Sequence, residues 1–251
     1  MTKTVMWKEM TAEELVAKAK ADAVVIMPVG SIEQHGPHLP VGVDTYLAEE
    51  VSRLAAEAVA GEMPIVVTPT LWCGMAEHHM AFGGTFTLDI PTYHALLGCF
   101  MKSLARHGFK RVLIVNGHGG NTAPLAAFLS DFARDTKLKV RSTTYFELSS
   151  PGMDKILEDQ PHVRHACEGE TSMLMVVAPG TVKTDRLAEA YGPKASTRIS
   201  PFVARDRCFK EITPSGVVGD ARRANADKGR RLLTHCRDAV VAVLRDPALW
   251  E

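Results

Sequence analysis

The sequence predicts one α/β domain whose central sheet is mostly parallel. Short apolar runs, typical of buried strands, alternate with longer segments in which apolar residues recur at helical spacing. Strand and helix alternate in this way where helical crossovers connect parallel strands. The chain has 251 residues and no internal repeat, low-complexity tract or linker. We therefore expect residues 1–251 to form a single domain.

Runs of apolar and β-branched residues predict four strands, and helical spacing predicts six helices. Thr11 and Glu14 have the spacing of a capping box, and Gly61 and Gly108 are expected to end two helices. The strands are expected at 23–27, 64–68, 111–115 and 139–146. The helices are expected at about 11–21, 46–59, 92–107, 122–136, 173–178 and 222–245, although the run 173–178 also fits a strand. Residues 71–85 and 151–161 are expected to be loops, and 187–214 to be irregular.

Composition and charge narrow the class of protein. The formal net charge is zero, which argues against nucleic acid as the main partner, because phosphate binding needs a basic surface. The five cysteines are odd in number and form no C-x-x-C pair, so neither a disulfide framework nor a cysteine zinc site is indicated. No signal-peptide core or membrane span is apparent. We expect a cytoplasmic enzyme or binding protein without a membrane partner.

A polar run rich in glycine and proline, residues 30–44, directly follows the first predicted strand. In an extended backbone Glu33 and His35 project to the same side and Gln34 points away. With Asp44 they offer the mixed oxygen and nitrogen ligands that suit zinc, manganese or iron. The alternative is a polar turn in which Glu33 and His35 only hydrogen-bond each other.

Two further polar segments are expected to reach the same edge of the sheet. The glycine-rich turn 116–121 follows the third predicted strand and presents His118, but it lacks the spacing of a phosphate loop. The segment 165–172 precedes the apolar run 173–178 and presents His165, Glu168 and Glu170. In parallel sheets such strand ends lie together, and ligands bind there.

These candidates are too many for a single zinc ion, which needs three or four ligands. They predict either a two-metal site with a bridging carboxylate, for which Asp44 is the candidate, or one metal with a proton-transfer shell. Two metals would generate hydroxide near neutral pH, and His165 would relay a proton to a departing amine. Ser31 or Cys167 as nucleophile would leave the carboxylates without a role. His78 and His79 are weaker candidates for the pocket, and His94, His107, His162 and His235 are expected to be surface or capping residues.

Five motifs, in order along nearly the whole chain, resemble the creatininase (creatinine amidohydrolase) family. They are P-V-G-S-I-E-Q-H-G-P-H-L-P at 28–40 with Asp44, F-G-G-T at 82–85, N-G-H-G-G-N at 116–121, H-A-C-E-G-E-T-S at 165–172 and G-V-V-G-D at 216–220. The resemblance implies a three-layer αβα sandwich and a homo-oligomer, often a hexamer. It also implies a binuclear metal centre in which Glu33 and His118 bind one ion, His35 binds the other and Asp44 bridges them. His165 matches the histidine that transfers a proton.

Two departures from the family pattern bear on the ligands and the substrate. Creatininases carry a glutamate two residues after the histidine of the N-G-H segment, where this chain has Gly120. We expect Glu168 to replace it as a ligand, with Glu170 as the alternative ligand and as a catalytic group beside His165. The pair of tryptophans expected to enclose creatinine is also missing, since the only tryptophans are Trp7, Trp72 and Trp250.

The sequence therefore predicts a metal-dependent hydrolase of this family that is not a creatininase in the strict sense. It would use a metal-bridging hydroxide to cleave a non-peptide amide or cyclic-amide C–N bond in a small molecule. Two divalent ions are expected, Zn²⁺ first and Mn²⁺ or Fe²⁺ as alternatives. Two other functions stay open: metal-dependent hydrolysis or isomerisation of a non-amide keto or polyol substrate, and metal binding without catalysis.

Overall fold

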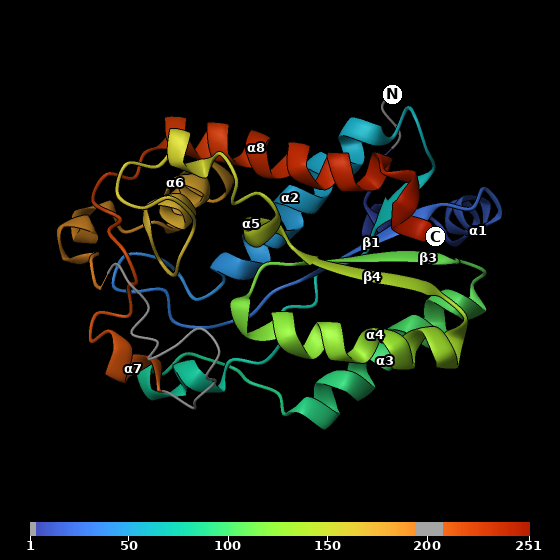
Figure 1. Cartoon of the computed structure of the whole chain (residues 1–251), viewed down its shortest axis with the longest axis horizontal. Helices are drawn as coiled ribbons and strands as arrows, with labels where there is room; N and C mark the ends of the chain where they lie inside the picture. The colour runs from blue at the N-terminus through green and yellow to red at the C-terminus, as the bar shows by residue number, and fades with distance from the viewer. Residues whose placement is uncertain (1–3, 194–207) are drawn as a thin grey trace.

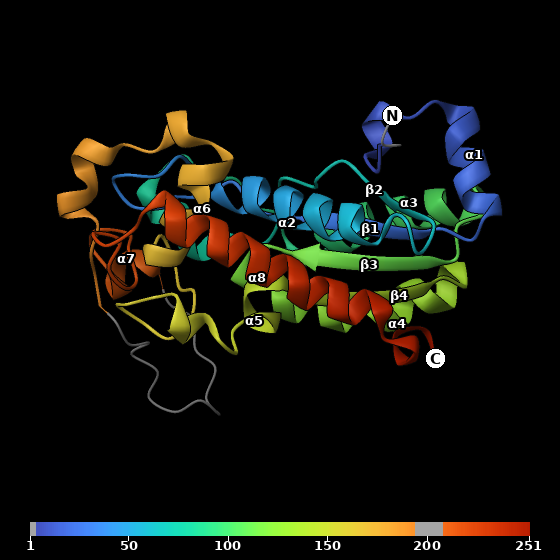
Figure 2. The same ribbon diagram turned by 90° about the horizontal axis from the view of Figure 1, so that it is seen from above.

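A sheet of four parallel strands lies at the centre of the protein, in the strand order β2, β1, β3, β4. The computed structural model describes residues 4–193 and 208–251. The strands are β1 (Val24–Val29), β2 (Ile65–Val67), β3 (Arg111–Asn116) and β4 (Lys139–Thr144). Helices cover both faces of the sheet (Figure 1, Figure 2), so the predicted three-layer αβα fold is confirmed.

The six predicted helices occur in the predicted order and differ at some ends, and a short helix that was not predicted, Tyr145–Leu148, replaces the end of the strand expected at 139–146. The structure has α1 (Ala12–Lys20), α2 (Val43–Val59), α3 (Ile90–Arg106), α4 (Thr122–Thr136), α5 (Tyr145–Leu148), α6 (Glu168–Val177), α7 (Phe209–Ile212) and α8 (Ala226–Arg245). The capping box of Thr11 and Glu14 is present. The last helix begins at Ala226 and not at residue 222, because the Asn225 side chain accepts a hydrogen bond from the Lys228 amide and caps it there. The stretch predicted as irregular contains α7, and its residues 194–207 lie outside the described part of the chain.

Alternate residues of each strand point into two separate apolar cores. Val24 and Ile26 pack with Leu113 on the face covered by α2, α6 and α8. Val25 and Ile114 pack on the opposite face, which α3 and α4 cover. Each fully buried side chain of this size contributes about 1.5–3 kcal/mol relative to exposure. Because both faces of the sheet are buried there, β1, β2 and β3 read as nearly continuous apolar runs in the sequence, whereas the edge strand β4 is mostly polar.

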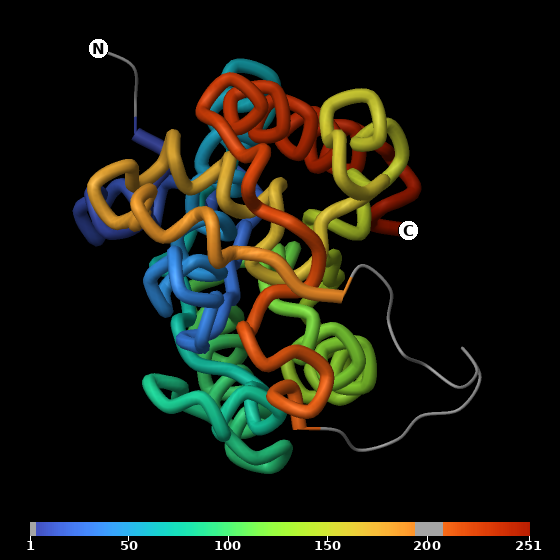
Figure 3. The backbone as a smooth tube through the Cα atoms, turned by 90° about the vertical axis from the view of Figure 1, so that its left-hand side faces the viewer, coloured from blue at the N-terminus to red at the C-terminus, as the bar shows by residue number. Residues whose placement is uncertain are grey.

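The strand order places a switch point between β1 and β3. The chain leaves β1 for its neighbour β2 on one side and later returns to β3 on the other side. Crevices of this kind, at the carboxyl ends of parallel strands, are where ligands bind in open α/β sheets. Figure 3 looks onto this end of the molecule, where loops from distant parts of the chain gather around the strand ends. Among the described helices, none is long and apolar enough to span a membrane.

Candidate metal centre

A cavity of about 470 Å³ opens at this switch point. Its floor is formed by polar side chains that follow β1 and β3 and by the first turns of α2 and α6. The loop 71–85, which includes a 3₁₀ helix at Glu77–Phe82, and the loop 157–165 form its walls. The cavity therefore lies where the sequence placed its three polar segments.

Two glycines let α2 approach both strand ends closely enough to deliver Asp44. A Cβ at Gly30, just after β1, would lie 2.8 Å from the Thr45 amide nitrogen. A Cβ at Gly117, just after β3, would lie 2.7 Å from the Asp44 carbonyl oxygen. The Asn121 side chain ties these segments together. Its nitrogen donates to the Gly30 carbonyl oxygen, and its oxygen accepts from the main-chain amide of Met75. The glycines of both motifs thus serve close backbone packing around the first turn of α2.

Buried carboxylates and imidazoles converge on Asp44. One of its oxygens lies 3.2 Å from His35 Nε2, and the other lies 3.2 Å from His118 Nδ1. His118 Nδ1 is also 3.0 Å from Glu33 Oε2. Glu170 approaches from the first turn of α6, where its Oε2 is 4.0 Å from His35 Nε2. All five side chains are less than 6% exposed.

Main-chain hydrogen bonds fix which nitrogen of each ring faces the carboxylates as a lone pair. His118 donates from Nε2 to the Met75 carbonyl oxygen at 3.0 Å, and His35 donates from Nδ1 to the Glu33 carbonyl oxygen at 3.1 Å. A neutral ring has one donor and one acceptor, so His118 Nδ1 and His35 Nε2 are both acceptors. In the neutral form that metal binding requires, both rings therefore point lone pairs at carboxylate oxygens. Both oxygens of Glu33, one of Asp44 and His35 Nε2 accordingly have no hydrogen-bond partner.

The electrostatics of these side chains agree with a missing positive charge. Burial lowers the pKa of His35, but Asp44 outweighs it, and the pKa is raised to about 9. Burial likewise opposes the charge of His118, yet Glu33 and Asp44 raise its pKa well above the ordinary value. Burial raises the pKa of Glu170 to about 8. Without another cation, protons must occupy the cluster, and a metal ion takes the place of those protons.

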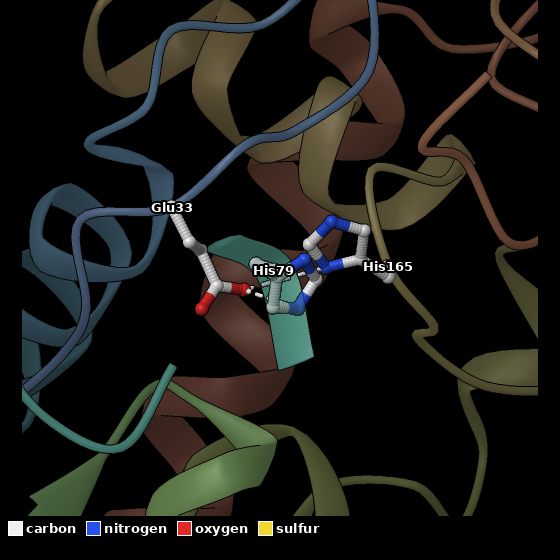
Figure 4. A group of neighbouring side chains, drawn as sticks. All are labelled: Glu33, His79 and His165. Carbon is white, nitrogen blue, oxygen red and sulfur yellow. Dashed lines mark ion pairs between the residues drawn. The ribbon is translucent and has the colours of Figure 1, made fainter. Parts of the chain in front are cut away.

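Gln34, His79 and His165 form a second layer above Glu33. The Gln34 side-chain nitrogen lies 2.9 Å from His79 Nδ1, and His79 Nε2 lies 3.2 Å from Glu33 Oε1. His165 donates from Nε2 to the Gln34 carbonyl oxygen at 2.8 Å, which leaves its Nδ1 as a lone pair 3.6 Å from Glu33 Oε1. Figure 4 shows the two rings converging on the Glu33 carboxylate from separate loops.

The Gln34 side chain contacts both histidines of this layer. Its oxygen accepts from the Gly36 amide, so its nitrogen faces the histidines. That nitrogen lies 2.9 Å from His79 Nδ1, 2.9 Å from His165 Nε2 and 3.3 Å from the Gly216 carbonyl oxygen. The ligand atoms of Glu33, His79 and His165 lie close enough together to hold a metal ion. Burial lowers the pKa of His79 to about 2 and that of His165 well below its ordinary value, so both rings are neutral.

Glu168, the expected replacement ligand, lies outside the cluster. Its Oε2 accepts hydrogen bonds from the amides of Glu158 and Asp159 at 3.0 and 2.9 Å, and its Oε1 pairs with Lys228 of α8. Its carboxylate is therefore fully engaged. Two residues along a helix turn the side chain by about 200°, so Glu168 and Glu170 face different surroundings. Glu170, the alternative ligand, faces His35 instead.

The structure also explains why residue 120 carries no side chain. A Cβ there would collide with the Met75 carbonyl oxygen and with His118 Nε2, the two atoms that hydrogen-bond to fix the His118 ring. A glutamate at this position would disturb that bond. Gly120 is therefore coupled to the orientation of His118.

Most predicted site residues come together, joined by the weaker candidates His78 and His79 and by residues that were not predicted: Gln34, His162 and Phe209. Glu33, His35, Asp44, His118, His165 and Glu170 meet at the cavity, whereas Glu168 does not. Gln34, expected to point away, lies against the histidines, and His78, His79, His162 and Phe209 line the cavity. Burial raises the pKa of the Cys167 thiol to about 12, so it is not a thiolate nucleophile. A long loop rich in histidine was the sequence signal that pointed to His78 and His79.

The fold and the site together define a metal-dependent hydrolase of the α/β class. A family model described as "Creatininase: Creatinine amidohydrolase" matches residues 8–244, and the chain belongs to the creatininase family. It is 31% identical over 232 residues to the mycofactocin precursor peptide peptidase of Mycobacterium tuberculosis (strain ATCC 25618 / H37Rv), covering 90% of this chain and 85% of that protein. It is 27% identical over 268 residues to the creatinine amidohydrolase of Pseudomonas putida, covering 98% of each chain.

The solved structures agree with this membership. A mutant creatininase of the Zn–Zn type superimposes with a TM-score of 0.83 at 26% identity, covering 97% of this chain and 98% of that chain. The chain is thus a metal-dependent amidohydrolase of this family, and the similarity to the peptide peptidases agrees with the expectation that it is not a creatininase in the strict sense.

Proposed function

We propose that the protein hydrolyses an amide C–N bond in a small molecule with two divalent metal ions. Glu33 and His118 would hold one ion, His35 and Glu170 the other, and Asp44 would be shared by both. The distances of 3.2 Å from the two Asp44 oxygens to different imidazole nitrogens support this division. Zn²⁺ suits this set of oxygen and nitrogen donors best, with Mn²⁺ and Fe²⁺ as alternatives.

One observation carries the proposal. His118 and His35 each donate one ring proton to a main-chain carbonyl and turn the other nitrogen, as a lone pair, toward buried carboxylates. Buried acceptors that face each other without a donor are costly unless a cation lies between them. Ring nitrogens held by such outer hydrogen bonds are the usual arrangement of metal-binding histidines.

The chain's own residues would hold the substrate and move the proton. The bound ions would supply a water of lowered pKa and polarise the amide carbonyl. His165 is neutral, and its Nδ1 lone pair faces Glu33 at the open side of the cluster. It would accept the proton of the attacking water at Nδ1 and return it to the leaving nitrogen, a step worth about 10²–10⁴-fold in rate. Gln34 holds the ring for this step by accepting the Nε2 proton on its carbonyl oxygen.

The cavity walls argue against creatinine itself. No tryptophan contributes to the described cavity, and Trp7 and Trp72 line a different groove beside α3. Aromatic surface near the metals comes from Phe146 and Phe209. A peptide bond is a second candidate substrate, which the 31% identity to the peptide peptidases favours. A panel of acylated amino acids, short peptides and cyclic amides would separate the two.

Assembly and location belong to the same proposal. The family resemblance favours a homo-oligomer, often a hexamer, and the cysteine pattern favours a reducing compartment such as the cytoplasm. Light scattering on the purified full chain would give the number of subunits. A monomer would contradict the assembly.

A pair of matched variants on α6 tests the metal site. Glu170→Gln and Glu168→Gln change one buried carboxylate each, two residues apart. We expect Glu170→Gln to lose about half of the bound metal, because it removes one ligand of one ion. Glu168→Gln should keep the wild-type metal content. Elemental analysis of folded, metal-loaded protein gives the ratio per chain, and the reverse pattern would reject this ligand set.

A further inference from the structure

The cavity carries one cationic side chain that the proposed reaction does not use. Arg164, next to His165, is the only lysine or arginine among the described residues that line it. Its side chain is half-buried, and no carboxylate of the described part of the chain forms an ion pair with it. Other arginines, such as Arg53 and Arg245, pair with glutamates. A guanidinium at a cavity wall without such a partner is available to a ligand.

The backbone around Arg164 is fixed from several directions. Its own amide donates to Cys167 Sγ at 3.2 Å, and the next carbonyl, of His165, accepts from the Val218 amide at 2.9 Å. Upstream, the Gln160 side chain donates to the His162 carbonyl oxygen at 2.8 Å. Glu168 holds the amides of residues 158 and 159 from behind. Arg164 is therefore presented on a segment that its neighbours hold in place, which lowers the entropy lost on binding.

The surroundings of Arg164 select the kind of ligand group. Phe146, Val163 and Phe209 give the cavity apolar walls, and His162 beside Arg164 has its pKa lowered by burial and by that guanidinium. Of the four acidic residues that line the described cavity, Glu33, Asp44 and Glu170 lie at the metal end, and Glu147 of α5 follows Phe146. A single guanidinium matches a single carboxylate, to which it donates two parallel hydrogen bonds.

We propose that Arg164 is a substrate-binding residue that receives a carboxylate, so that the substrate is an amide bearing both a carboxylate and an apolar group. N-acylated amino acids and the carboxyl ends of short peptides belong to this class. The proposal rests on amide hydrolysis at the same site. It makes Arg164, and not the metal ions, the group that selects the charge of the substrate.

A pair of probes that differ only in charge tests the assignment. N-benzoylglycine carries a carboxylate, and N-benzoylglycinamide replaces it with a neutral amide. Calorimetric titration of the zinc-loaded full chain should show the acid binding about 10-fold or more tightly than the amide, as charge-assisted bidentate pairing predicts. In Arg164→Gln this preference should fall to less than about threefold, and Arg164→Lys should keep part of it.

The control is Arg222→Gln, which removes an exposed arginine that pairs with Asp220 outside the cavity. It should leave the preference unchanged. Equal affinity of the wild type for both probes, or no binding of either, would overturn the proposal. So would a preference that survives in Arg164→Gln, because the carboxylate would then sit on the metal ions. Zinc content and melting temperature confirm that each variant is folded and loaded.

A separate assay keeps this inference distinct from the proposed function. Release of glycine from N-benzoylglycine, with and without a chelator, measures metal-dependent amide hydrolysis directly. If the metal-loaded protein hydrolyses no amide of the substrate panel, the proposed function fails whatever the binding preference is. If it hydrolyses amides but Arg164→Gln leaves the ratio of kcat/KM for acid over amide unchanged, only the role of Arg164 fails.

Discussion

Glu168 and Glu170, two buried carboxylates in the first turn of α6, differ in how their charges are compensated. Glu168 is matched by Lys228 and two main-chain amides, so its charge is satisfied within the chain. Glu170, two residues later, joins Glu33, Asp44 and two imidazoles whose lone pairs face them. Burying a charge is costly unless it is paired. The comparison contrasts a carboxylate whose charge is compensated within the chain with a cluster whose shared deficit of positive charge suits an ion.

The largest expected effect is on catalysis at the group with the deficit. Asp44→Asn removes the carboxylate that touches both imidazoles, so both ions should be lost or misplaced. We expect kcat/KM for the best amide of the panel to fall by about 10³-fold or more. The control is Asp227→Asn, which changes an exposed aspartate in the first turn of α8. If Asp44→Asn protein of measured metal content kept wild-type activity, Asp44 would not belong to the metal centre.

Changes to the Glu168–Lys228 pair should alter the free energy of unfolding and leave the metal content unchanged. Lys228→Met leaves the fully buried Glu168 without its cation. Breaking a buried pair by removing one partner typically costs about 3–5 kcal/mol of unfolding free energy. The double variant Lys228→Met with Glu168→Gln should recover part of that loss, because no unpaired charge remains. Urea unfolding measures the free energies, and elemental analysis should find unchanged metal.

Either of two results would contradict this separation. Loss of bound metal in Lys228→Met would place Glu168 within the metal site after all. A double variant no more stable than Lys228→Met alone would show that the buried charge is not the source of the cost.

Local pattern in the sequence predicted the residues that follow strand ends. Glu33, His35 and His118 come directly after β1 and β3, whose carboxyl ends meet at the switch point, so spacing alone brought them together. Asp44 could be added because α2 starts right after the same loop. The buried strands and most helices were likewise predicted from apolar periodicity.

The remaining residues depend on contacts that spacing does not reveal. The choice between Glu168 and Glu170 is decided by Lys228, which lies 60 positions from Glu168 and reaches it from α8. Gln34 points away from Glu33 and His35 along an extended backbone, but the loops that bear His79 and His165 meet it there. Sequence periodicity locates a side chain on one face of its own segment. It does not say which other segment will cover that face.

A smaller effect is expected from a buried histidine that is neutral, His38. It is fully buried and hydrogen-bonded to Thr171, and burial lowers its pKa to about 4. Because its pKa is lower in the folded than in the unfolded state, the folded chain resists protonation. Its contribution to stability is present above about pH 6.5 and is lost as the pH falls toward 4, about 3 kcal/mol in all.

His38→Gln should flatten this acid limb of the stability curve. Unfolding free energies of wild type and variant, measured by urea between pH 7 and 4, give the difference. His107→Gln, at the carboxyl end of α3, is the matched control and should keep the wild-type slope. A wild-type slope in His38→Gln would assign the acid limb to other groups.

The smallest effect is expected for Glu158, the exposed neighbour of the Glu168–Lys228 pair. Glu158 contacts both Lys228 and Arg223, but it is exposed, so water screens its charge. Glu158→Gln should therefore leave the melting temperature nearly unchanged, while Lys228→Met lowers it clearly. Lys228 pairs with both Glu158 and Glu168. When the lysine is removed, only the buried one, Glu168, is left with an uncompensated charge. If Glu158→Gln destabilised the chain as much as Lys228→Met, burial would not be what separates a structural carboxylate from a surface one.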